Sequence, residues 1–226
     1  CIKKRYSCGS IVSMERFKNR KCKLPKISMK VRNKLYNLLK ITDKIFIKNS
    51  INYWAEGGTL LGIVRHGEII PWDDDIDISI MEKDFNKIIP LRKEFNKYGY
   101  DIARIWYGYK IFRMDGRPII RKHGNKTYRY KFPFLDVFIR KKKNKKLIFA
   151  LTDWWKKFYF NVDEVFPLKR YKLGPIYLNG PKKPLPYLNR GYKNWDKKLV
   201  CNGSHSSLKK ISCPNYDYKI DFSKFS

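Results

Sequence analysis

The feature that most constrains this chain is a cluster of four aspartates within the five residues 73–77. Carboxylates this close together repel one another, and the repulsion raises their pKa values unless a cation neutralises them. The isoleucines of residues 76–80 alternate with polar residues, which is the period of a β-strand with one apolar face. Asp75 and Asp77 would share the other face, roughly 6–7 Å apart along the backbone, where both side chains can reach one or two hard cations. The pattern therefore predicts a Mg²⁺ or Mn²⁺ site on a strand.

The residues before this cluster predict an anion-binding turn. An acidic run alone is also typical of a solvated loop or a structural calcium site, so the neighbouring residues must show which of these interpretations holds. Residues 51–55 favour a short strand, Gly57 and Gly58 a tight turn, and residues 59–65 a helix with Thr59 as N-cap. Unpaired backbone N–H groups and the positive end of the helix dipole would face the turn and bind phosphate oxygens. A phosphate site beside a metal site indicates phosphoryl chemistry.

Residues 54–78, WAEGGTLLGIVRHGEIIPWDDDIDI, resemble the signature of a known family. The family is that of LicD-type phosphocholine transferases with the fukutin and fukutin-related proteins, in the DNA polymerase beta-like nucleotidyltransferase superfamily. The resemblance continues in PFLDVFIR (133–140) and in residues 165–197, and it covers residues 28–200. It implies an α+β nucleotidyltransferase fold of the polymerase beta type, with a mixed central sheet flanked by helices and an irregular C-terminal wrap.

Asp136 is the third candidate carboxylate. It interrupts an apolar run, and burying an unpaired carboxylate costs several kcal/mol, on the order of 3–5. Two interpretations are open: a salt bridge to one of the many lysines, or a place beside Asp75 and Asp77. The resemblance implies the second, in which Asp136 ligates a second metal ion or takes the proton of the acceptor.

Four basic residues complete the candidate site as substrate-binding groups. Arg65 and His66 either contact phosphate or cap the helix that they end. Lys110 and Arg113 lie on a predicted strand whose counterpart in the relatives approaches the nucleotide, and surface salt bridges explain them equally well. Glu56 precedes the turn, where a carboxylate beside phosphate is unfavourable unless it points away or binds sugar hydroxyls.

The resemblance implies a metal-dependent transferase that moves a phospho-alcohol group, phosphocholine or a polyol phosphate, from a CDP-linked donor to a glycan hydroxyl. Two Mg²⁺ ions on Asp75, Asp77 and Asp136 would bridge the donor pyrophosphate, and the glycine turn with Thr59 would hold phosphate oxygens. Three alternatives stay open. These are a glycosyltransferase with a D-x-D metal site, a basic protein that binds or modifies nucleic acid, and a catalytically inactive relative.

The net charge of +31, from 51 basic and 20 acidic residues, predicts polyanionic partners. Nucleic acid, an anionic membrane surface and an anionic glycan all fit such a field, and the charge does not choose among them. No RNA-binding or DNA-binding motif accompanies the charge, so nucleic acid is not favoured.

The length of 226 residues predicts one domain with peripheral ends: a basic arm at 1–26, a catalytic domain at 27–200 and a tail at 201–226. No run of about 18 apolar residues and no signal peptide is visible, which favours the cytoplasm. Because the first residue is Cys1, an N-terminal anchor ahead of it would instead indicate a Golgi or lumenal protein.

The five cysteines all lie outside the predicted site. Free thiols are the default expectation, and an oxidising compartment would allow two bridges with one thiol left over. A zinc site at Cys201, His205 and Cys213 is disfavoured by the irregular spacing.

The rest of the chain predicts further elements. A helix begins at Ser28, and a second one at 84–98 is divided near Pro90. We also expect strands at 100–106, 109–114 and 134–139, an exposed turn at 140–146, a helix at 147–159 with two partly buried tryptophans, and irregular structure from Pro167.

Overall fold

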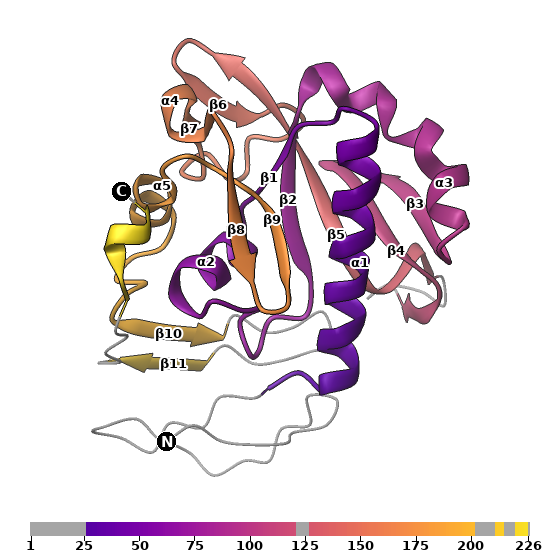
Figure 1. Cartoon of the computed structure of the whole chain (residues 1–226), viewed down its shortest axis with the longest axis horizontal. Helices are drawn as coiled ribbons and strands as arrows, with labels where there is room; N and C mark the ends of the chain where they lie inside the picture. Colours follow the sequence, from indigo (N-terminus) through magenta and orange to yellow (C-terminus); the bar gives the residue numbers. More distant parts are fainter. Residues whose placement is uncertain (1–25, 121–126, 202–210, 215–219, 226) are drawn as a thin grey trace.

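The chain folds around a mixed seven-stranded sheet with helices and a β-hairpin packed against it (Figure 1). The computed structural model describes residues 26–120, 127–201, 211–214 and 220–225. Nearly all of the predicted arm at 1–26, together with His205 and the cysteine side chains, lies outside the described residues. The α+β class with a mixed central sheet is confirmed.

The strands of this sheet follow the order β1-β2-β5-β4-β3, and β6 and β7 continue it from β5. Strands β2 and β5 run parallel, whereas the other described pairs are antiparallel. The parallel pair lies in the middle of the sheet, where it joins the aspartate cluster to the predicted third carboxylate. The strands are β1 Tyr53–Ala55, β2 Ile76–Met81, β3 Tyr100–Ile105, β4 Gly108–Ile120, β5 Thr127–Lys143, β6 Lys146–Phe149 and β7 Phe160–Asn161.

Helix α1 begins where the sequence predicts, because the Ser28 side chain accepts the N–H of Val31 (3.3 Å). It packs against β5 and β9, while α2 packs against β2 and α5. The predicted division near Pro90 is confirmed, since short 3₁₀ segments precede α3 there. The helices are α1 Met29–Lys48, α2 Gly57–Arg65, α3 Arg92–Asn96, α4 Val162–Val165 and α5 Pro184–Gly191, with 3₁₀ turns η1 Glu82–Lys87, η2 Ile89–Leu91 and η3 Phe222–Phe225.

The apolar core lies along β1, β2 and β5. Ile78, Ile80, Val137 and Trp54 are all fully buried, which confirms the apolar face predicted for the aspartate-bearing strand. Ser79 on the opposite face is fully buried as well. Both faces of the sheet are therefore covered at this point, and the strand that carries the carboxylates is held rigidly.

Two predictions around the end of β5 are wrong. Residues 140–143 are not an exposed turn but continue β5, which pairs with β6; Arg140 is fully buried, and the turn falls at Asn144 with φ of 55°. Residues 147–159 are not a helix, because β6 continues to Phe149 and turns lead on to β7. Of the tryptophan pair, Trp154 is 79% exposed rather than partly buried.

The C-terminal part is more regular than predicted. Strands β8 (Lys169–Leu173) and β9 (Ile176–Gly180) form a hairpin that packs against β1 and α1. Strands β10 (Lys198–Cys201) and β11 (Ile211–Pro214) form a second hairpin, so the predicted boundary at residue 200 falls inside β10. Among the described residues, none of the helices combines the length and the apolar character that a membrane span requires.

Candidate active site

The sheet brings the three predicted carboxylates together. Asp77 on β2 lies directly opposite Asp136 in the parallel register with β5, and Asp75 precedes β2 by one residue. One oxygen of each of Asp75, Asp77 and Asp136 lies within 4.8 Å of the other two. Three carboxylates at this separation form an oxygen-rich site of the kind that hard divalent cations prefer.

Asp77 is the most strongly perturbed of the three. Burial raises the pKa of its carboxyl well above the ordinary value, and the negative charges of Asp75 and Asp136 raise it further. With all three groups ionised the cluster carries three negative charges, more than one neighbouring lysine offsets, and a bound cation would relieve the remaining repulsion. The donor set and its electrostatics fit a divalent metal ion.

The start of helix α2 holds Asp77 in place. The Gly58 N–H donates to Asp77 Oδ2 (3.1 Å), and the Asp77 N–H donates to the Thr59 hydroxyl (2.8 Å). The helix begins at Gly57 with Glu56 as N-cap, so the predicted N-cap role of Thr59 is wrong. The Gly57 N–H donates to the Tyr187 hydroxyl (3.2 Å). The anion at this helix N-terminus is thus Asp77 itself, and contacts of these glycines with phosphate stay a prediction.

Position 57 requires glycine, for two reasons. Its φ of 56° lies in the left-handed region, and a Cβ there would overlap the Asp77 carboxylate, 3.0 Å from Cγ. We expect Gly57→Ala to displace Asp77 and lower turnover by about a hundredfold or more, because misplacing a reacting group by about 1 Å has that cost.

Gly67→Ala is the matched control for this substitution. Gly67 has a similar φ of 66°, but a Cβ there meets no atom within 4 Å. Both variants carry the same backbone strain, so both lose thermal stability, whereas only Gly57→Ala should lose activity. Equal activity in the two variants, measured at a temperature where both are folded, would contradict the role of Gly57.

Asp136 has two protein partners besides the carboxylates. Lys110 Nζ lies 2.6 Å from its Oδ1 and donates to its Oδ2 (2.8 Å), and the Tyr107 hydroxyl donates to Oδ1 (3.0 Å). Burial and the neighbouring Asp136 charge raise the pKa of Tyr107, which keeps this hydroxyl protonated as a donor. The two interpretations of Asp136 are therefore compatible, since it joins the cluster and also pairs with a lysine.

Lys110 is itself buried and surrounded by aromatic rings. Its ammonium lies 3.4 Å from the ring centroid of Phe134 and 4.9 Å from that of Tyr130. With 3% of its surface exposed, its positive charge depends on Asp136 and these rings for stabilisation. Lys110 therefore lies next to the predicted metal site and contacts Asp136, one of the predicted metal ligands.

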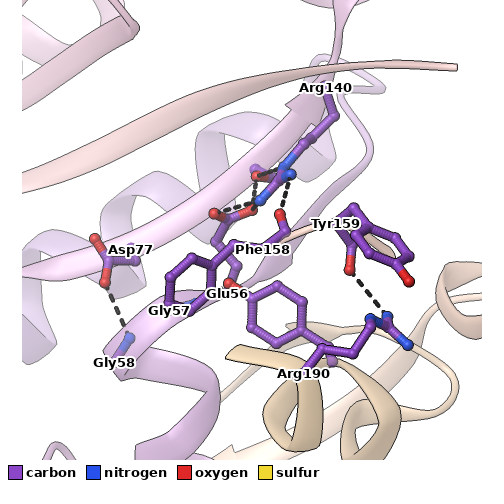
Figure 2. A network of polar contacts seen from close by, with 10 residues as sticks. Glu56, Gly57, Gly58, Asp77, Arg140, Phe158, Tyr159 and Arg190 are labelled. Carbon is purple, nitrogen blue, oxygen red and sulfur yellow. Dashed lines mark hydrogen bonds and ion pairs between the residues drawn. The ribbon is translucent and has the colours of Figure 1, made fainter. Parts of the chain in front are cut away.

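A second buried ion pair lies behind the helix start (Figure 2). Arg140 is fully buried, and its guanidinium donates to both Glu56 carboxylate oxygens at 2.7 Å and to the Phe158 carbonyl at 2.6 Å. The Ser79 hydroxyl donates to Glu56 as well. The Glu56 carboxylate is therefore directed toward Arg140, and Glu56 is the residue at which α2 begins.

Arg65 and His66 lie apart from this cluster. They end α2, about 12 Å from Gly57 along the helix axis. Arg65 is buried and donates to the Trp195 carbonyl (2.9 Å), while the His66 ring packs edge-on against Trp72. Burial, with the charges of nearby arginines, lowers the pKa of His66 to about 2, so this ring is neutral at physiological pH.

Arg113 also lies away from the carboxylates. It stands three residues beyond Lys110 on β4, hence on the other face of the sheet, and pairs with Asp115 (2.7 Å). A surface salt bridge thus accounts for it. Tyr107, Tyr187 and Arg140 were not predicted as site residues. A tyrosine in a turn and an arginine at the start of a basic run carry no local signal, because their partners are distant in sequence.

Known proteins resemble this chain over the same region. The family described as "LicD/FKTN/FKRP, nucleotidyltransferase domain" matches residues 50–183, more than half of the chain. An uncharacterized protein of Rickettsia typhi is 39% identical over 184 residues, which are 80% of this chain and 52% of that protein. The chain thus spans about half the length of this relative.

Two relatives with named activities match over shorter stretches. The human ribitol 5-phosphate transferase FKRP is 52% identical over 42 residues, 19% of this chain and 8% of that protein. The lipopolysaccharide cholinephosphotransferase LicD of Haemophilus influenzae is 36% identical over 53 residues, 24% of this chain and 20% of that protein.

Proposed function

Because this chain belongs to the LicD/FKTN/FKRP nucleotidyltransferase domain family, we propose that it is a metal-dependent transferase. It moves a phospho-alcohol group, phosphocholine or a polyol phosphate, from a CDP-linked donor to a glycan hydroxyl. The observation that carries the proposal is the meeting of Asp75, Asp77 and Asp136 within 4.8 Å beside the start of α2. The relatives named as ribitol 5-phosphate and choline phosphate transferases support the class of the transferred group. The same family membership supports a nucleotidyltransferase-type fold.

Asp75, Asp77 and Asp136 would hold the metal ion, Mg²⁺ or Mn²⁺. When bound, such an ion neutralises charge on the phosphate oxygens of the donor. In the proposed reaction a new bond forms between the acceptor oxygen and the phosphorus that carries the alcohol. The bond from that phosphorus to the bridging oxygen breaks, CMP leaves with the electron pair, and the proton of the acceptor hydroxyl passes to the Asp136 carboxylate and from there to water.

The chain's own residues orient this site. Gly58 and Thr59 fix Asp77 through a side-chain and a main-chain hydrogen bond, and Lys110 and Tyr107 fix Asp136. Because Lys110 and Tyr107 both donate to Asp136, they support its role as an anionic ligand. Lys110 also brings a buried positive charge close to the position proposed for the donor phosphates.

A thermal-shift experiment tests the donor class. Cytidine nucleotides with Mg²⁺ should raise the melting temperature more than adenosine or guanosine nucleotides do, and EDTA should remove the difference. A ligand at a hundred times its dissociation constant adds about 2.7 kcal/mol to stability. Equal shifts from all nucleotides, or shifts that survive EDTA, would argue against a metal-dependent CDP site. A preference for a sugar nucleotide would favour the glycosyltransferase alternative. Tight, sequence-dependent binding of RNA at physiological salt would favour the alternative of a nucleic-acid-binding protein.

Asp136→Asn should lower turnover far more than it lowers cytidine nucleotide affinity, because its contribution is greatest as the acceptor attacks. The variant also leaves Lys110 buried without its ion pair, so its melting temperature should fall. Combining it with Lys110→Met removes the orphaned charge. The double variant should regain stability without regaining turnover, as measured by melting temperature and donor hydrolysis. Turnover that returned together with stability would reduce Asp136 to a structural role.

A further inference from the structure

Two tryptophans lie exposed near the end of β6. Trp106, in the turn between β3 and β4, is 52% exposed, and Trp154, in the turns that follow β6, is 79% exposed. Their ring centroids are 4.7 Å apart, so the two rings form one surface feature. Leu151, which borders the same cavity as both rings, is 39% exposed. Apolar side chains that gather at a surface in this way mark an interaction site, whereas single exposed residues do not.

Lysines surround these apolar side chains. Lys141 and Lys143 of β5 border a cavity of about 790 Å³ together with Trp106 and Trp154. Residues 141–157 contain seven lysines and a single acidic residue. Six of these lysines are exposed, and Lys141 is half-buried. We use the name tryptophan patch for Trp106, Leu151, Trp154, Lys141 and Lys143.

The tryptophan patch is separate from the carboxylate cluster. Lys141 and Lys143 lie beyond Asp136 on β5, in a part of the strand that pairs regularly with β6. Both are an odd number of residues away from Asp136, and side chains alternate between the two faces of a sheet, so they lie on the opposite face from Asp136. Binding at the patch therefore requires no group of the carboxylate cluster.

The composition of the patch favours a lipid surface over a protein partner or a flat ligand. Lysine is depleted in protein–protein interfaces, whereas it is attracted to the anionic surface of a bilayer. Tryptophan is enriched where membranes meet water, because its ring is apolar and its N–H is polar. Trp106 and Trp154 already contact each other, so a nucleobase or a sugar ring cannot be enclosed between them. An acyl chain needs no such gap, since apolar contact is not directional.

We propose that the tryptophan patch docks this protein on the surface of a membrane that contains anionic phospholipids. Trp106, Leu151 and Trp154 enter the boundary between head groups and acyl chains, and Lys141 and Lys143 pair with the lipid phosphates. Docking goes beyond the proposed function and does not depend on it, because no nucleotide or metal ion takes part.

Co-sedimentation of the full chain with vesicles tests the proposal at physiological ionic strength. Phosphatidylcholine vesicles should bind the protein only when they also contain phosphatidylglycerol. Trp154→Ala should weaken this binding by about tenfold or more. The Trp154 N–H donates to the Thr152 hydroxyl (3.2 Å), and this contact of the turn is retained in the variant. Tyr177→Ala, at an aromatic residue that is 58% exposed on β9, is the control and should bind like the wild type.

The lysines are tested with a pair of variants that remove equal charge. Lys141→Gln with Lys143→Gln should weaken binding to the anionic vesicles by about tenfold or more. The same double change at Lys30 and Lys40, which are exposed on α1, should have a smaller effect. Equal losses from the two pairs would show that the net charge alone attracts the vesicles, and would overturn the role of the patch.

Quenching of tryptophan fluorescence shows which surface enters the bilayer. Phosphatidylglycerol with brominated acyl chains should quench part of the emission of the wild type. Trp106→Phe with Trp154→Phe should remove most of this quenching, although the other tryptophans of the chain remain. Undiminished quenching in the double variant would mean that a different surface enters the bilayer.

Three further results would overturn the proposal. One is the absence of binding to anionic vesicles. Another is self-association that depends on Trp154 in a protein that binds no vesicles, which would assign the patch to contacts between copies of the chain. The third is binding of single-stranded RNA that depends on Trp154 and that anionic vesicles do not displace. If vesicles bind as proposed but cytidine nucleotides do not, the proposed function fails and the docking surface stands.

Discussion

Asp77→Asn should abolish turnover while leaving the metal-free protein at least as stable as the wild type. Asp77 lies in the centre of the carboxylate cluster, where burial and two like charges raise the pKa of its carboxyl. The amide is nearly isosteric and removes one negative charge, so repulsion decreases. The amide is also a poorer ligand for a hard cation, and we expect a loss of turnover of about a thousandfold or more.

The effect on stability should depend on pH with a definite sign. A carboxyl whose pKa is higher in the folded than in the unfolded protein binds its proton more tightly when folded. Its ionisation therefore removes stability as the pH rises from the ordinary carboxyl pKa through the raised value. In EDTA, the melting temperature of Asp77→Asn should exceed that of the wild type by more at neutral than at acid pH.

Asp163→Asn is the control for this variant, because its carboxylate is 76% exposed at the start of α4. It should retain turnover and show no such dependence of stability on pH. Full activity in Asp77→Asn would remove the site assignment. A large loss of metal-free stability in this variant would show instead that the Asp77 charge holds the fold together.

Arg140→Met should cost about 3–5 kcal/mol in the free energy of unfolding, because it leaves the Glu56 carboxylate buried without its ion pair. Glu56 is 2% exposed, and the guanidinium supplies hydrogen bonds to both of its oxygens. The loss should extend to function, since Glu56 is the residue on which α2 begins and α2 positions Asp77.

A double-mutant cycle separates these contributions. Replacing Glu56 and Arg140 together by methionine removes both buried charges and should restore most of the lost stability. Arg170→Met serves as control: Arg170 pairs with Asp43 at 2.6 Å but is 41% exposed, so its loss should cost about 1 kcal/mol or less. Chemical denaturation measures the free energy of unfolding of the wild type, of Glu56→Met and Arg140→Met, of the double variant and of Arg170→Met. If the double variant were less stable than Arg140→Met alone, the cost would come from lost packing and not from the orphaned charge.

The local parts of the site were predictable from the sequence, and the distant pairings were not. The alternation of isoleucine and polar residues predicted β2 and its buried face, and the helical spacing of apolar residues after Ser28 predicted the start of α1. Arg140, by contrast, stands at the head of a run of lysines, which predicted an exposed turn. Arg140 is buried because it pairs with Glu56, which lies 84 residues earlier in the chain. A local sequence pattern cannot predict a partner at that distance.

The start of α2 shows a similar limit. A hydroxyl ahead of an apolar helix predicted Thr59 as N-cap, but Gly57 and Gly58 adopt the first helical turn because Asp77 accepts a helix N–H there. The acceptor that replaces the cap comes from a strand 19 residues later. The contact between the Trp106 and Trp154 rings, whose centroids are 4.7 Å apart, was not predicted either, because the two residues lie in separate turns that are far apart in the sequence.

The pairing of β5 with β2 and β4 places Asp77, Asp136 and Lys110 opposite one another on adjacent strands, in a row across the sheet that we call the rung. Since side chains alternate between faces, an insertion or deletion of one residue within this rung would turn Asp136 away from Asp77. The irregular pairing of β4 with β5 lies farther along, between Phe112 and Arg117 and between Pro118 and Ile120. The far end of this hairpin can therefore gain or lose residues in evolution without disturbing the rung, and we expect homologues to differ in length there while the chemistry persists.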